Sequence, residues 1–189
     1  SSAASDVYKR QIPGSVFIGL HGGFAPWVGA LIMDVNQPLI LVTPEGKEEE
    51  TVTRLARVGF DNSLGYLQGG ITAWKAAGFE TDSIRSVSPE AFAEADENCV
   101  VVDSRRPGEF DAGHVVNALN IPLDFVNDQM AEVPKEGDFY LHCAGGYRSI
   151  IMASILKARG YHNMINVEKG FGGIKATSVK TTLNTPAQL

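Results

Sequence analysis

One segment of the chain, YLHCAGGYRSIIMASILKARG (residues 140–160), carries residue types suited to thiol chemistry. Its pattern predicts a strand that ends at Cys143, a six-residue loop over 143–148 and a helix from about Ser149. Ligands bind beyond the carboxyl ends of strands in open α/β sheets. Gly145 and Gly146 allow positive φ values, so that successive backbone N–H groups turn toward the sulfur. We therefore predict that Cys143 is a nucleophile.

The surroundings of this cysteine favour its thiolate form. Backbone N–H groups, the positive end of the following helix and the guanidinium of Arg148 all stabilise a negative charge on sulfur. The same groups would stabilise a terminal persulfide, and exchange between two thiolates needs no acid-base pair. We predict that the rest of the loop and the start of the helix form the substrate-binding site. These residues are Ala144, Gly145, Gly146, Tyr147, Arg148 and Ser149.

Short apolar runs alternate with amphipathic stretches, which is typical of strand-helix repeats and a parallel sheet. Ser88 and Pro89 predict the start of a helix through Phe92. A helix after Glu48 places Val52, Leu55 and Ala56 on one face. Strands are predicted over 99–102, 119–121, 139–143 and 164–167, and earlier over 39–42 and 64–67.

The chain repeats itself at a period of about 100 residues, which is the signature of two copies of one unit. Residues 38–62 parallel 138–163, since both read as strand, glycine-bearing loop, helix and glycine stop. Residues 69–78 continue the match against 169–178. The boundary falls near 82–86. The first copy has no room before Ile12 for an opening strand, so we expect it to be incomplete.

Composition narrows the class of protein further. The net charge is -6 and the sequence has no block of basic residues, which argues against nucleic acid or an anionic membrane as a partner. Two cysteines give no disulfide framework and indicate a reducing compartment such as the cytoplasm. No apolar run reaches the length of a membrane span. Residues 1–11 have no hydrophobic periodicity, and we interpret them as a non-native leader on a fragment.

The loop CAGGYRS resembles the active-site loop of the rhodanese family, with Cys143 at the sulfur-carrying position. The segment VVVDSRRPGEFDAGHVVNALNIP resembles the pattern that precedes this loop in the family, and the resemblance covers nearly all of residues 97–177. It implies a rhodanese-like α/β fold, with a five-stranded parallel sheet and helices on both faces. It also carries over Asp103 and Arg105 as supports beside the loop. Their hydrogen bonds would serve either the fold or the loop directly.

The resemblance divides the chain into a tandem pair. We expect a leader over 1–11, a truncated, inactive rhodanese-like domain over 12–82, a complete, active domain over 84–180 and a tail over 181–189. In the first copy Thr43 stands in place of Cys143 and Glu48 in place of Arg148. An acidic residue there would repel a persulfide, and Thr43 has no base to activate it.

The tandem pair is also similar to the C-terminal region of bacterial fusions that place a metallo-β-lactamase-fold persulfide dioxygenase ahead of rhodanese modules. Such a domain would be an upstream partner in the native chain. Its clustered His/Asp metal motif is absent from this sequence, and the four histidines are too scattered to replace it. We therefore expect neither a metal site nor a cofactor in this chain.

The sequence leads to a sulfurtransferase that moves sulfane sulfur from thiosulfate or a small-molecule persulfide to a thiol or cyanide through Cys143. Neutral Ala144 and Tyr147 leave thiosulfate and a persulfide equally plausible as donors. The alternative is a module that relays or senses persulfide for a larger dioxygenase fusion, without independent turnover. A phosphatase or arsenate reductase is a weaker interpretation, because these expect Cys-x5-Arg and this loop is Cys-x4-Arg.

Overall fold

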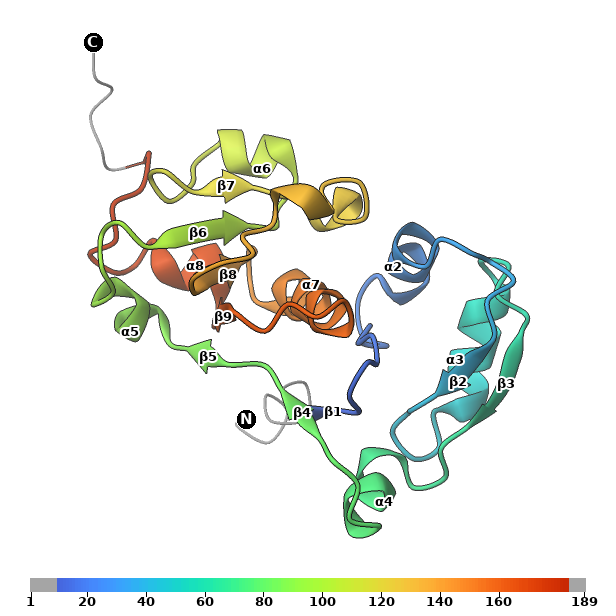
Figure 1. Ribbon diagram of the computed structural model, residues 1–189. Coiled ribbons are helices and arrows are strands. Elements are labelled where there is room, and N and C mark those ends of the chain that lie inside the picture. The colour runs from blue at the N-terminus through green and yellow to red at the C-terminus, as the bar shows by residue number, and fades with distance from the viewer. Residues whose placement is uncertain (1–9, 184–189) are drawn as a thin grey trace. The chain divides into compact units, whose positions relative to one another are not determined.

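The computed structural model describes residues 10–183, and the chain divides after Asp82 into two compact units (Figure 1). The first unit consists chiefly of residues 17–82, and the second of the described residues from Ser83 onward. Most of the expected leader, residues 1–9, and most of the expected tail, residues 184–189, lie outside the described residues.

The second unit contains a five-stranded sheet in the order β5-β9-β8-β6-β7. Every pairing in it is parallel, and β8 lies at the centre between β9 and β6. The predicted five-stranded parallel sheet is confirmed. The strands are β5 (Ser86–Val87), β6 (Val100–Asp103), β7 (Leu119–Asn120), β8 (Phe139–His142) and β9 (Met164–Val167).

Helices cover both faces of this sheet, as predicted (Figure 1). The helix α7 contacts β8 and β9 on one face. On the other face, α5 and α8 join Val101 and Tyr140 in one hydrophobic cluster. The elements that connect the strands are α5 (Pro89–Ala93), α6 (Pro107–Asp111), the 3-10 turns η1 (Leu123–Phe125) and η2 (Met130–Glu132), α7 (Tyr147–Ala158) and α8 (Gly170–Ile174).

The start of α7 differs from the prediction in a way that bears on the loop. The helix begins at Tyr147 rather than at Ser149, because Gly146 at its N-cap has a φ of 103° and ends the loop there. Arg148 is therefore a residue of the first helical turn rather than of the loop. By contrast, α5 begins as predicted, since the hydroxyl of Ser88 accepts a hydrogen bond from the N–H of Ala91 at 3.2 Å.

The first unit contains a smaller α/β arrangement around a core of Phe24, Val28, Leu55 and Phe60. The predicted face of its middle helix is wrong for Val52 and Ala56, which are exposed. The helix α2 contacts α3, and the buried side of α3 contains Leu55, as predicted, together with Thr51. The elements are α2 (Phe24–Leu31), β2 (Leu39–Leu41), α3 (Glu48–Ala56), β3 (Ser63–Tyr66) and α4 (Gly70–Ala76), and two short strands, β1 (Arg10–Gln11) and β4 (Asp82–Ser83), complete the described chain.

The internal repeat is visible in the backbone. The order β2-α3-β3-α4 in the first unit matches β8-α7-β9-α8 in the second, and both strand pairs are parallel. Gly70 and Gly170 open the last helix of each series with φ values of 55° and 52°. A Cβ on Gly70 would meet the carbonyl oxygen of Thr43, and a Cβ on Gly170 would meet that of Cys143. The tandem arrangement is thus confirmed, with Thr43 in the place of Cys143.

Candidate active site

Cys143 is the first residue after β8, at the carboxyl end of the central strand. Its side chain is 1% exposed. Its Sγ accepts a hydrogen bond from the backbone N–H of Gly146 at 3.1 Å. Gly146 is also the N-cap of α7, which is 12 residues long, so the sulfur lies at the positive end of a helix. This arrangement stabilises a negative charge on sulfur.

The start of α8 binds the backbone of the loop through hydrogen bonds. The N–H of Phe171 donates to the carbonyl of Cys143 at 2.7 Å, and the N–H of Gly172 donates to that of Ala144 at 3.0 Å. A Cβ on Gly170 would lie 2.2 Å from the carbonyl oxygen of Cys143. Only glycine permits so close an approach of two backbones at this φ. The sequence did not single out Gly170 or Phe171 as part of the site.

Arg148 forms an ion pair that the sequence did not predict. Its guanidinium donates two hydrogen bonds to the carboxylate of Glu109 in α6, from Nη1 at 2.6 Å and from Nη2 at 2.7 Å. Glu109 also accepts from the backbone N–H of Arg106 at 3.2 Å. The hydrogen bonds from Arg148 lower the pKa of Glu109 to about 2. The cation expected to face a persulfide is therefore held by a carboxylate.

The pKa of Glu109 gives a direct test of this pair. We expect the carboxyl to titrate near pH 2 and, in Arg148→Met, to move back toward its ordinary value of 4.5. A lowered carboxyl pKa stabilises the folded state above pH 4.5, and this contribution is lost as the pH falls toward 2. Carbon NMR of the glutamate carboxyls measures both values.

A control variant separates the ion pair from general effects of lost charge. Arg85 holds Asp138 in a similar bidentate pair, with contacts of 2.9 and 2.8 Å. Arg85→Met should raise the pKa of Asp138 and leave that of Glu109 unchanged. A wild-type Glu109 that titrates near 4.5 would contradict the ion pair described here.

Asp103 and Arg105 form a buried pair at the end of β6. Their side chains are 0% and 6% exposed, and the shortest contact, from Arg105 Nη2 to Asp103 Oδ2, is 2.6 Å. Arg105 also donates to the carbonyl of Gly113 at 2.7 Å, and its guanidinium lies 4.1 Å from the ring centroid of Phe171. Since Phe171 holds the carbonyl of Cys143, the pair reaches the loop through that aromatic residue.

His142 does not face the sulfur. Its side chain is completely buried, its Nδ1 lies 3.2 Å from the carbonyl oxygen of Cys143, and its ring stacks beside Phe171 at 6.2 Å. Burial lowers its pKa, which favours the neutral imidazole. Successive residues of a strand point to opposite faces. His142 is therefore not placed to act as a general base for Cys143.

The other predicted site residues lie around the same loop. Ala144 and Gly145 are exposed, whereas Tyr147 is partly buried in the first turn of α7. The hydroxyl of buried Ser149 donates to the carbonyl of Gly146 at 3.3 Å. The sequence did not predict a role for Asn120. Its side-chain amide donates to the carbonyls of Asp103 and Arg105, which places it beside this pair.

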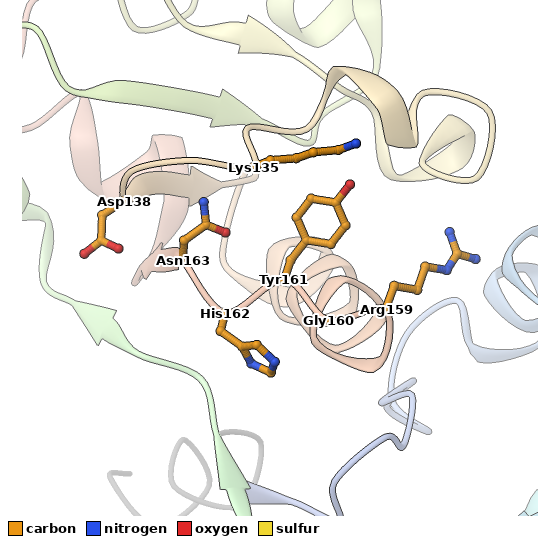
Figure 2. Close-up of a pocket in the computed structure, with 7 residues that line it drawn as sticks. All are labelled: Lys135, Asp138, Arg159, Gly160, Tyr161, His162 and Asn163. Atoms are coloured by element: carbon orange, nitrogen blue, oxygen red, sulfur yellow. The ribbon is translucent and has the colours of Figure 1, made fainter.

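A surface pocket lies at the other end of the sheet (Figure 2). Asp138 and Asn163 immediately precede β8 and β9, so the pocket marks the amino ends of these strands, whereas Cys143 follows the carboxyl end. It is therefore not part of the site around Cys143. Its lining residues are Lys135, Asp138, Arg159, Gly160, Tyr161, His162 and Asn163.

Two kinds of feature are missing from the described chain. Within residues 10–183, no three His, Cys, Asp or Glu side chains are grouped so as to hold a metal ion. None of the helices in that same range has the length and hydrophobicity needed to cross a bilayer.

A parallel sheet that places a buried cysteine at the N-terminus of a helix defines an α/β protein with a cysteine-bearing loop at the carboxyl end of its central strand. The sequence matches the rhodanese-like domain family twice, over residues 3–77 and 88–177. The chain belongs to this family, and both of its units are covered by the matches.

Individual proteins are similar to parts of this chain. A sulfurtransferase of Allochromatium vinosum is 32% identical over 74 residues, which are 39% of this chain and 69% of that protein. A tRNA uridine(34) hydroxylase of Erwinia tasmaniensis is 35% identical over 81 residues, or 40% of this chain but 23% of that protein. A crystal structure of a rhodanese-related protein from Thermoplasma volcanium is 24% identical, with a TM-score of 0.47, and covers 52% of this chain and 98% of that chain.

Proposed function

We propose that the second unit is a sulfurtransferase that moves sulfane sulfur from thiosulfate or a small-molecule persulfide to a thiol or cyanide through a persulfide on Cys143. One observation carries the proposal: Cys143 Sγ lies at the N-terminus of α7 and accepts the N–H of Gly146 at 3.1 Å. Membership of the rhodanese-like family and the sulfurtransferase relative support a sulfurtransferase-type activity.

The proposed reaction has two balanced steps. The thiolate of Cys143 attacks the outer sulfur of the donor, a sulfur-sulfur bond forms, and the donor's own bond to that sulfur breaks. The leaving group, sulfite from thiosulfate or a thiolate from a persulfide, takes the electron pair. An acceptor thiolate or cyanide then attacks the terminal sulfur, and Cys143 leaves as a thiolate. Neither step needs a cofactor.

The loop backbone supplies the binding surface for the transferred sulfur. The N–H of Gly146 faces Cys143, and the exposed Ala144 and Gly145 lie on the solvent side of the loop. Tyr147 and Ser149 border it from the first turn of α7. A site built from backbone N–H groups suits a single sulfur anion, because these donors have fixed positions and carry no full charge.

The first unit is proposed to be inactive. Thr43 occupies the place of Cys143, as the matching contacts of Gly70 and Gly170 indicate. A threonine hydroxyl is a poor nucleophile without a base. Glu48 opens α3 where Arg148 lies near the start of α7, and a carboxylate there would repel a persulfide anion.

The setting of the whole protein is also a proposal. We place the chain in the cytoplasm, behind an upstream metallo-β-lactamase-fold persulfide dioxygenase, with a small-molecule sulfur donor and a thiol acceptor as its partners. Neither nucleic acid nor a membrane is a proposed partner, because the net charge is -6 and the sequence has no block of basic residues that could bind either.

A second candidate function rests on the burial of the nucleophile. A side chain that is 1% exposed favours slow exchange with free donors, as expected for a module that relays or senses persulfide for a fused domain. Steady-state transfer kinetics distinguish the two. Repeated turnover with several acceptors supports the enzyme, whereas one stoichiometric loading supports the relay.

The experiment that tests the proposal is intact-mass spectrometry of the reduced protein after incubation with thiosulfate or with glutathione persulfide. We expect a gain of one sulfur atom that disappears on adding cyanide. Peptide mapping should place this sulfur on Cys143. No adduct from either donor would refute the proposed persulfide mechanism.

A further inference from the structure

Both arginines beside the loop are occupied by carboxylates. Both Nη1 and Nη2 of Arg148 donate hydrogen bonds to the carboxylate of Glu109, and Arg105 is paired with the fully buried Asp103. The ion pair of Arg148 is partly sheltered, since the two side chains are 17% and 38% exposed. Lys169 borders Gly146 through its backbone, but its side chain is exposed.

This occupancy matters for the first step of the proposed reaction. Thiosulfate brings two negative charges, and its sulfonate oxygens need hydrogen-bond donors while Cys143 attacks the outer sulfur. A guanidinium suits such an oxyanion because its planar N–H fork binds two oxygens at once. Here the carboxylate of Glu109 already fills that fork. A dianion must therefore displace Glu109 or bind beside its charge.

We infer that Glu109 determines the specificity of the site: it disfavours dianionic donors and selects donors that bring a single negative charge to the loop. The inference rests on the proposed function of Cys143. With a pKa of about 2, Glu109 is ionised at every pH at which a thiolate acts, so its repulsion of a dianion is always present. Coulomb repulsion from one unit charge acts more strongly on two charges than on one.

Two donors that differ mainly in charge provide the probe. Thiosulfate is a dianion, and methanethiosulfonate is a monoanion with the same bond between the outer sulfur and a sulfonyl sulfur. With either donor, Cys143 forms a bond to the outer sulfur, and sulfite or methanesulfinate leaves with the electron pair. The measured quantity is the ratio of kcat/KM for thiosulfate to kcat/KM for methanethiosulfonate, with cyanide as acceptor.

The test variant is Glu109→Gln, which keeps the size of the side chain and an oxygen that accepts from the N–H of Arg106. We expect this ratio to rise about tenfold, because one unit of repulsion near the donor is removed. The matched control is Asp138→Asn, which removes the same charge from another bidentate arginine pair, just before the amino end of β8. Its ratio should equal that of the wild type.

The outcomes separate this inference from the proposed function. An unchanged ratio in Glu109→Gln, while both donors still load Cys143, overturns the role of Glu109 and leaves the sulfurtransferase standing. Equal rises in Glu109→Gln and Asp138→Asn also overturn it, since any lost charge would then suffice. Failure of both donors to load wild-type Cys143 overturns the proposed function together with the inference.

A measurement on the wild type keeps the inference testable if Glu109→Gln does not fold. Sulfate is an unreactive dianion, and methanesulfonate is an unreactive monoanion of similar shape. Each is added while Cys143 is alkylated with iodoacetamide. We expect sulfate to protect Cys143 no better than methanesulfonate does. Clearly stronger protection by sulfate would show that the site binds a dianion more tightly than a monoanion, and would overturn the inference.

Discussion

Cys143→Ser is expected to abolish sulfur loading and to lower the rate of transfer at least about a thousandfold. A serine hydroxyl stays protonated at neutral pH, so the N–H of Gly146 and the dipole of α7 would have no anion to stabilise. The hydroxyl is also unable to form a sulfur-sulfur bond. The rate of thiocyanate formation from thiosulfate and cyanide, together with intact mass, measures both effects.

The chain offers its own control in its second thiol. Cys99 is half-buried and packs against the cluster between the sheet and α5. Burial raises the pKa of its thiol, which keeps it protonated and unreactive. Cys99→Ser should therefore load sulfur as the wild type does. Two results would contradict the proposed mechanism: sulfur bound to Cys143→Ser in wild-type amounts, or loss of sulfur loading in Cys99→Ser. Either would show that Cys99 carries the sulfur.

The sequence could predict the central elements because their signals are local. The apolar run of β9 is bounded by turn residues, and this strand occupies the predicted residues. Ser88 and Pro89 likewise marked the start of α5. The internal repeat alone aligned Thr43 with Cys143. The five-stranded parallel sheet followed from the resemblance of one continuous segment, whereas the order of its strands was not predicted.

Two predictions about helices failed, one for a local reason and one because the answer depends on a neighbour elsewhere in the fold. The start of α7 was misplaced because Gly146 adopts a left-handed conformation that ends the loop early. The exposed Val52 illustrates a second cause, since the packing of α2 decides which side of α3 is buried. Helical periodicity shows that one face is apolar, but not which neighbour covers it.

The same reason explains what was missed at the site. Arg148 and Glu109 are separated by 39 residues, and no local sequence pattern predicts the hydrogen bonds between them. Glu109 was visible only as part of the EF pair in a family-like segment, without a role. Phe171 had no signal at all, although it connects Arg105 to the carbonyl of Cys143. Type and spacing identified the nucleophile, whereas its charge partners required the fold.

Asp103→Ala is expected to cost the second unit about 3 to 5 kcal/mol of unfolding free energy. Asp103 is 0% exposed and accepts hydrogen bonds from the backbone N–H, Nε and Nη2 of Arg105. Removal of its carboxylate leaves the guanidinium buried without a counter-charge. The guanidinium of Arg105 then keeps the carbonyl of Gly113 and the ring of Phe171 as its described contacts.

The measurement has to report on the second unit. Both tryptophans, Trp27 and Trp74, lie in the first unit, so their fluorescence follows the wrong part of the chain. Hydrogen exchange of the β6 and β8 backbone amides, followed by mass spectrometry across a urea series, reports on the sheet that holds Cys143. We expect both strands to lose protection at lower urea in Asp103→Ala than in the wild type.

A double variant distinguishes an unpaired buried charge from a simple loss of packing. In Asp103→Leu/Arg105→Met both charges are absent and the volume is largely kept, so the double variant should recover at least about 2 kcal/mol relative to Asp103→Ala. If the double variant is no more stable than Asp103→Ala, the loss arises from the bonds of Asp103 itself, not from a stranded guanidinium. If the double variant is stable but transfers sulfur poorly, the cation over Phe171 positions the loop, because Phe171 also holds the carbonyl of Cys143. Stability and turnover together thus decide between the two roles of Asp103 and Arg105 that their residue types alone leave open.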